Sequence, residues 1–177
     1  MKIGVFFDLH NTLTDANEAW KSAYRDLVSN SEHRKIAKMI DQKESREKLC
    51  VEHGLDYGLV TQRYRENLSI NEYGLLLLNS LSKHFEVCLV TNSSKEKTIS
   101  DLKKIGLNQK FKKVYTKENG TKPDPEYIKD IIKENNFDLV FMIGNDVYED
   151  FVISDNIIPI IIDFPKCNKT LKLKNDT

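Results

Sequence analysis

The stretch Ile3-Gly4-Val5-Phe6-Phe7-Asp8-Leu9-His10-Asn11-Thr12 passes from a short apolar run into polar, turn-forming residues. Its first five residues are mostly β-branched or aromatic and show no alternation with polar residues. Such a run is typical of a strand that is buried on both faces of a parallel sheet. The polar residues that follow then lie where that strand ends.

Further apolar runs in the second half of the chain predict four more strands, over residues 87–91, 113–116, 139–143 and 157–162, with Pro159 interrupting the last. Helical patterns separate them, over residues 94–105 and 126–135, and a short helix is expected from Val147. Strands that alternate with helices predict an α/β fold, here a Rossmann-like parallel sheet flanked by helices.

Residues 16–83 carry no comparable strand signal and are rich in Lys, Glu, Arg, Gln and Leu. Apolar residues such as Trp20, Tyr24 and Leu27 recur there at helical spacing. We therefore expect residues 1–15 and 84–165 to form the α/β core and residues 16–83 to form a small all-helical insertion. Residues 166–177 are predicted to be a polar C-terminal tail.

The composition is that of a soluble globular domain, with 40% hydrophobic and 31% charged residues in a chain of 177. The formal net charge is zero, which gives no reason to expect a nucleic-acid or membrane partner. Three widely spaced cysteines, Cys50, Cys88 and Cys167, fit neither a disulfide framework nor a zinc site. A reducing, cytoplasmic location is expected.

Polar side chains cluster at the carboxyl ends of the predicted strands, where sites of open parallel sheets lie. Three carboxylates at one sheet edge would repel each other unless a hard cation such as Mg²⁺ lay among them. A lysine and hydroxyl groups would suit the oxygens of a phosphate. These residues are Asp8, His10 and Thr12; Thr91, Asn92 and Ser93; Lys122; and Asn145, Asp146 and Asp150.

Four segments in this order resemble the motifs of the haloacid dehalogenase superfamily. They are Phe6-Phe7-Asp8-Leu9-His10-Asn11-Thr12-Leu13, Leu89-Val90-Thr91-Asn92-Ser93, Lys122-Pro123-Asp124-Pro125, and Ile143-Gly144-Asn145-Asp146-Val147-Tyr148-Glu149-Asp150. Any one of them alone would be a weak signal, and Asp8 alone could simply cap a helix. Together they indicate a phosphatase-type member of that superfamily, in which the helical insertion is a cap over the site.

The resemblance implies a role for each of these residues. Asp8 would be the nucleophile that forms an aspartyl-phosphate. Mg²⁺ would be held by Asp8, by the backbone carbonyl of His10 and by Asp146, with Asp150 ordering the ligand waters. Substrate phosphate would be bound by Thr91, Asn92 and Lys122. The implied substrate is a small phosphorylated metabolite, and the implied assembly is a monomer or homodimer.

His10 departs from the family pattern, because the phosphatases carry an acid/base aspartate two residues after the nucleophile. An imidazole can do this work near neutrality, which would keep His10 catalytic. Alternatively, the reaction has a leaving group that needs no proton, or the chain binds phosphate with impaired turnover in a regulatory role. The sequence thus predicts a Mg²⁺-dependent phosphomonoester hydrolase, which His10 in place of the aspartate would slow, and leaves the other two alternatives open.

Overall fold

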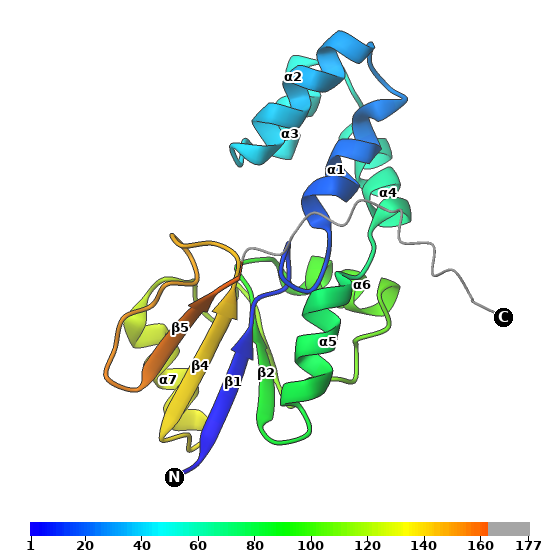
Figure 1. Cartoon of the computed structure of the whole chain (residues 1–177). Coiled ribbons are helices and arrows are strands. Elements are labelled where there is room, and N and C mark those ends of the chain that lie inside the picture. The colour runs from blue at the N-terminus through cyan, green and yellow to red at the C-terminus, as the bar shows by residue number, and fades with distance from the viewer. Residues whose placement is uncertain (163–177) are drawn as a thin grey trace, which may run out of the picture.

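A computed structural model describes residues 1–162 and shows one sheet of five parallel strands in the order β3-β2-β1-β4-β5 (Figure 1). The strands are β1 (Ile3–Phe7), β2 (Glu86–Val90), β3 (Val114–Tyr115), β4 (Leu139–Gly144) and β5 (Ile157–Ile161). The expected Rossmann-like α/β fold is confirmed. Pro159 does not interrupt β5, since it keeps its register opposite Met142 on a strand at the sheet edge.

Seven helices lie within the described residues. They are α1 (Ala16–Arg25), α2 (Asn30–Asp41), α3 (Arg46–Glu52), α4 (Tyr57–Asn67), α5 (Glu72–Leu81), α6 (Lys95–Lys104) and α7 (Pro125–Glu134). Within residues 1–162, none of the helices has the length and apolar character that crossing a membrane requires. The predicted polar tail, 166–177, lies outside the described residues, as do 163–165 of the predicted core.

Strand β1 is buried on both faces because helices cover each side of the sheet. Phe6 packs with Ile128 and Ile131 of α7 on one face. Val5 and Phe7 point to the opposite face and share a hydrophobic cluster with residues of α5 and α6. This arrangement explains why the strand is apolar without alternation.

Helices α1 to α4 form a separate hydrophobic cluster, which Figure 1 shows beyond the carboxyl ends of the strands. Trp20 of α1 stacks on Tyr64 of α4, with ring centroids 4.1 Å apart. We call α1 to α4 the cap. The chain enters and leaves it side by side, where Thr14 bridges Ile70 and the Asn71 amide donates to the Leu13 carbonyl at 2.9 Å.

Helix α5 packs on the sheet, although the predicted insertion ran to residue 83. Leu78 of α5 is fully buried together with Leu9, Leu13 and Val87. A leucine-rich helix pattern shows that a face is buried but not which partner buries it. The structure therefore ends the cap cluster at Leu68.

The prediction of a short helix from Val147 is wrong, because residues 147–150 form a turn instead. The Asp146 carboxylate accepts from the Tyr148 amide at 2.9 Å, and Asp150 accepts from the Asp146 amide at 3.0 Å. Such local bonds between side chains and the backbone compete with helix formation. The turn leaves both carboxylates at the carboxyl end of β4.

Candidate active site

The carboxyl ends of β1, β2 and β4 bring the predicted polar residues to one edge of the sheet. Asp8 follows β1 directly, and its amide donates to the Ile143 carbonyl at 2.8 Å, which continues the sheet pairing. Thr91 follows β2 and is tied in the same way to the carbonyl of Tyr115 at 3.0 Å. Both side chains are buried, so the backbone of the sheet fixes their positions.

Lys122 is the cation at the centre of this edge. Its Nζ lies 2.7 Å from Asp8 Oδ1 and 2.5 Å from Asp150 Oδ1, and its side chain is fully buried. Asn92 holds the lysine's backbone from both sides: Asn92 Oδ1 accepts from the Lys122 amide at 2.8 Å, and Asn92 Nδ2 donates to the Lys122 carbonyl at 3.0 Å. In this structure Asn92 therefore positions Lys122.

Burial dominates the electrostatics of this group. It raises the pKa of Asp8 to about 6; Lys122 opposes that rise and Asp150 adds to it. For Lys122, burial would lower the pKa, but the two carboxylates outweigh it and the pKa is raised. Lys122 thus stays an ammonium, while the Asp8 carboxylate needs further positive charge to be fully ionised near neutrality.

Asp150 supports the site from inside the protein. Its Oδ1 contacts Lys122, and its Oδ2 accepts from the amide of Asp146. A Cβ on Gly144 would lie 2.1 Å from Asp150 Cγ, so only glycine leaves room for this carboxylate. Both oxygens of Asp150 are therefore engaged by protein groups, which fits a supporting role better than direct metal binding.

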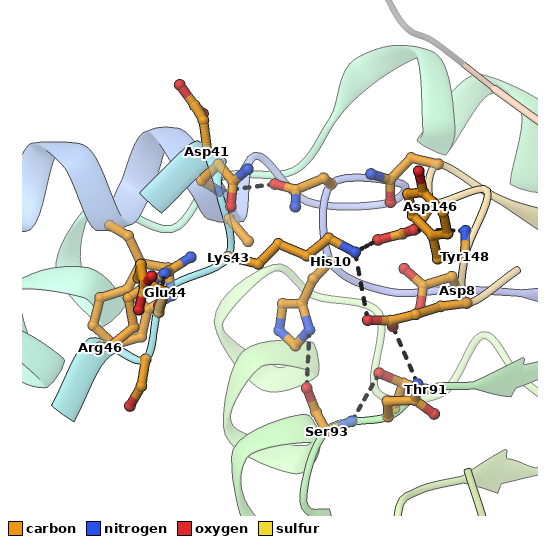
Figure 2. Close-up of a pocket in the computed structure, with 18 of the residues that line it drawn as sticks. Asp8, His10, Asp41, Lys43, Glu44, Arg46, Thr91, Ser93, Asp146 and Tyr148 are labelled. Carbon is orange, nitrogen blue, oxygen red and sulfur yellow. Dashed lines mark hydrogen bonds and ion pairs between the residues drawn. The ribbon is translucent and has the colours of Figure 1, made fainter. Parts of the chain in front are cut away.

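Asp146 is paired with the ammonium of Lys43, which comes from the loop between α2 and α3 of the cap (Figure 2). The same ammonium lies 3.6 Å from Glu149 Oε1. Lys43 has a positive φ of 62°, which turns the loop sharply at this point. The cap thus reaches the predicted metal ligand through one lysine.

The oxygen atoms around Asp8 fit a hard divalent cation. Asp8 Oδ2 accepts one long bond of 3.4 Å, from Thr12 Oγ1, and is otherwise available as a ligand. Asp146 already attracts a cation, the Lys43 ammonium. Within residues 1–162 no group of three or more His, Cys, Asp and Glu side chains is arranged to hold a metal. A site built from two carboxylates and the His10 carbonyl does not need such a group.

The imidazole of His10 lies between the sheet edge and α6. Its Nδ1 is 3.0 Å from Ser93 Oγ, as Figure 2 shows. Its Nε2 is 2.8 Å from Asp101 Oδ2 and also 2.8 Å from Lys97 Nζ. Burial lowers the pKa of His10, the hydrogen bond to Asp101 opposes this, and the Lys97 charge adds to it.

A cleft with a volume of about 730 Å³ lies between the sheet edge and the cap. Asp8, Thr91 and Asp146 line it from the core, while Trp20 and Arg46 line it from the cap. The Arg46 guanidinium lies over the Trp20 ring, 5.9 Å from the ring centroid. A small anionic molecule would therefore meet both carboxylates and cations in this cleft.

A family model described as haloacid dehalogenase-like hydrolase matches residues 5–156, which is most of the chain. The chain belongs to this family. A search of curated proteins finds no match to its sequence.

Solved structures of haloacid dehalogenase-like proteins share the fold. The hydrolase YfnB of Bacillus subtilis, bound to magnesium, is 23% identical with a TM-score of 0.64, covering 84% of this chain and 82% of that one. A phosphatase from Thermococcus onnurineus is 22% identical with a TM-score of 0.56, covering 85% and 80%. L-2-haloacid dehalogenase from Xanthobacter autotrophicus is 14% identical with a TM-score of 0.64, covering 84% and 72%.

The polar site residues predicted from the sequence lie together at the carboxyl edge of the sheet. Asp8, Lys122 and Asp150 contact one another directly, and Asn92 contacts Lys122. Thr91 Oγ1 accepts from the Ser93 amide at 3.3 Å. Sequence reasoning missed the residues that approach from elsewhere, namely Lys43, Tyr64, Lys97 and Asp101. Only the i,i+4 spacing of Lys97 and Asp101 on a helix gave a local signal.

Proposed function

We propose that the chain is a magnesium-dependent phosphomonoester hydrolase that acts on a small phosphate ester through an aspartyl-phosphate on Asp8. The observation that carries this proposal is the buried contact between Lys122 and Asp8. A fully buried ammonium beside a carboxylate is arranged to offset the charge that gathers when a phosphate dianion approaches that carboxylate. Burial within the protein makes this interaction stronger than it would be in water.

The residues divide the work of such a reaction. An Asp8 oxygen would attack phosphorus while the bond from phosphorus to the ester oxygen breaks, and the departing oxygen would take a proton from water in the cleft. A water molecule would then attack the same phosphorus as its bond to the Asp8 oxygen breaks, and its proton would leave with the phosphate, which restores the carboxylate. Lys122 holds Asp8, and Thr91 lies at the end of the neighbouring strand β2. Asp8, the His10 carbonyl and Asp146 would hold magnesium, which supplies positive charge to the phosphoryl oxygens.

The test is phosphate release from an aryl phosphate and from a panel of phosphorylated metabolites, with and without Mg²⁺. Asp8→Asn keeps the size of the side chain but removes the nucleophile, so we expect turnover to fall about a thousandfold or more. Circular dichroism would establish that the variant is folded. An Asp8→Asn variant as active as the wild type would refute the proposal.

A second candidate is a phosphate-binding protein with impaired turnover. The lowered pKa of His10 favours it, because a neutral imidazole has no readily available proton for a leaving alcohol. If this candidate holds, the wild type is inert across the panel and His10→Asp gains phosphatase activity. If the wild type turns over and His10→Asp adds nothing, the second candidate fails.

A hydrolase of carbon–halogen or carbon–phosphorus bonds is a third candidate, since one structural neighbour is a haloacid dehalogenase. The pair Asp146 and Asp150 favours a metal and a phosphoryl group instead. Release of halide from haloacids, or of phosphate from phosphonates, without activity on esters would select the third candidate.

A further inference from the structure

Among the lysine and arginine side chains that line the cleft within residues 1–162, only Arg46 has no carboxylate partner. Lys43 is paired with Asp146, and Lys97 Nζ lies 2.5 Å from Asp101 Oδ2. The polar contacts of Arg46 are to backbone carbonyls, which carry no net charge. The charge of Arg46 is therefore left without a counterpart in the described part of the chain.

The guanidinium of Arg46 is nevertheless held in place. Its Nη1 donates to the Glu44 carbonyl, and its Nη2 donates to the Ile40 carbonyl at 3.3 Å. It lies over the ring of Trp20, which is itself stacked on Tyr64. A cation that is already fixed loses little conformational freedom when it binds a ligand.

Most of the hydrogen-bond donors of Arg46 remain unused. A guanidinium has five N–H groups, of which the two carbonyls accept one each. Arg46 Nε is buried and has no hydrogen-bond partner among the described residues, although buried donors are normally paired. Each Nη also keeps one N–H. The planar fork of a guanidinium matches the oxygens of a carboxylate or a phosphate, so an oxyanion would supply both the acceptors and the charge.

Arg46 lies across the cleft from the proposed phosphate site. Figure 2 shows Arg46 on the cap side and Asp8 and Thr91 on the core side. A substrate whose phosphate is held at Asp8 would present its other end to the cap. Acidic residues outnumber lysine and arginine in the lining of the cleft, so a second negative charge would be favoured only beside a cation that has no partner.

We propose that Arg46 determines substrate specificity by binding a second anionic group, a carboxylate or a phosphate, on the part of the ester that leaves. Because the first phosphate is placed at Asp8, this assignment rests on the proposed function. The substrate class becomes small phosphate esters with an additional oxyanion at the far end. Alkyl phosphates without that oxyanion would leave the Arg46 charge unpaired.

Equilibrium binding tests the proposal without requiring turnover. Asp8→Asn removes the proposed nucleophile, so the ligands are not consumed, and it is the background for every variant. Carboxyalkyl phosphates of increasing chain length are compared with alkyl phosphates of the same length, and alkanediol bisphosphates form a second arm, all with Mg²⁺ present. Isothermal titration calorimetry measures each affinity. Trp20 is the only tryptophan, so its fluorescence gives an independent signal beside Arg46.

At one chain length or more, we expect the ligand with the additional oxyanion to bind at least about tenfold more tightly than the matched alkyl phosphate. The arm with the larger preference identifies the oxyanion as carboxylate or phosphate. Adding Arg46→Met should abolish the preference and leave the affinity for alkyl phosphates within about twofold. Arg46→Lys should keep part of the preference, because it retains the charge but not the fork.

The matched control is Arg34→Met, which removes an exposed arginine from α2 and should leave the preference unchanged. An unchanged melting temperature would establish that Arg46→Met is folded. If Arg46 only anchors the loop between α2 and α3, its loss would weaken both ligands of a pair equally or lower stability without changing their ratio. That result overturns the proposal, as does the absence of a preference at every chain length.

Failure of this proposal is distinguishable from failure of the proposed function. A wild type that hydrolyses alkyl phosphates through Asp8 but shows no preference for the additional oxyanion would overturn only the role of Arg46. A protein that releases no phosphate but loses a measured preference in Arg46→Met would keep that role and reject the turnover. In an active enzyme, Arg46→Met should raise KM for the doubly anionic ester about tenfold and change kcat little.

Discussion

Lys122 is the residue on which the geometry around Asp8 depends. It separates two buried carboxylates, Asp8 and Asp150, which would otherwise lie near each other without a cation among the described residues that touches both. Removing one member of a buried ionic group leaves charge that is neither paired nor hydrated. The same residue would therefore contribute both to stability and to the proposed chemistry of the site.

For Lys122→Met we predict a free energy of unfolding lower by about 3 kcal/mol, because two buried carboxylates lose their cation. Turnover should fall about a hundredfold or more, since a preorganised charge beside the phosphate is lost. Urea unfolding and phosphate release measure the two effects.

The matched control is Lys129→Met on α7, where the lysine pairs with Glu126 on the exposed surface. Surface pairs contribute little, so its unfolding free energy should change by less than about 1 kcal/mol. Equal effects of the two variants would contradict the buried role of Lys122.

At the scale of the elements, helix α5 packs against the loop that follows Asp8, the proposed nucleophile. A Cβ at Gly74 would lie 2.1 Å from the Thr12 carbonyl oxygen, so the helix approaches this backbone as closely as glycine allows. The single proton of the Thr12 hydroxyl lies between Asp8 Oδ2 and the nearer Asn145 Oδ1, at 3.4 and 3.1 Å from Oγ1, which ties the loop to the end of β4. Packing of α5 thus helps to place the loop after Asp8.

We predict that Gly74→Ala destabilises the protein by about 1–3 kcal/mol, because the new methyl group must displace the backbone at Thr12. This reverses the usual stabilisation when alanine replaces glycine in a helix. Thermal or urea unfolding measures the change.

Gly58→Ala in α4 is the comparison for Gly74→Ala. A Cβ there meets only the side chain of Asp56, at 3.0 Å. Gly58→Ala should leave the free energy of unfolding unchanged or raise it by up to about 1 kcal/mol. If Gly74→Ala were equally benign, the close approach of α5 to the loop would not constrain the structure.

Much of the sheet and of the polar edge that forms the candidate site could be predicted from the sequence. The apolar run before Asp8 and the polar residues after each strand locate the sheet edge, because parallel strands end together. The element that α5 packs against could not be predicted, because the sequence pattern indicates that Leu78 is buried but not which element buries it. The contact of Lys43 with Asp146 depends on how the cap approaches the core, and nothing local at residue 43 indicates it.

At the scale of the whole molecule, the cap contacts the site through a lysine whose charge a metal ion would have to replace. The Lys43 ammonium contacts Asp146, a proposed magnesium ligand. A cation that is part of the chain and a cation from solution cannot occupy the same position at this carboxylate. Binding of the proposed magnesium ion would therefore be linked to the position of the cap loop.

We predict that Lys43→Met binds Mg²⁺ about two- to fivefold more tightly than the wild type, as expected when a competing, partly exposed ion pair is removed. Isothermal titration calorimetry measures this affinity. Lys38→Met, on an exposed position of α2, is the control and should leave it unchanged. Weaker Mg²⁺ binding in Lys43→Met would show that the lysine does not compete for Asp146.

Strand β1 lies at the centre of the sheet, yet its neighbours β2 and β4 begin only at Glu86 and Leu139. During synthesis on the ribosome, residues 16–68 are complete before either neighbour exists, and they can bury their apolar side chains within the cap. The apolar faces of β1 have to wait, because distant pairings form slowly and late. A growing chain whose cap folded first would therefore carry it on an unpaired strand, and at that stage a chaperone would meet the exposed apolar faces of β1.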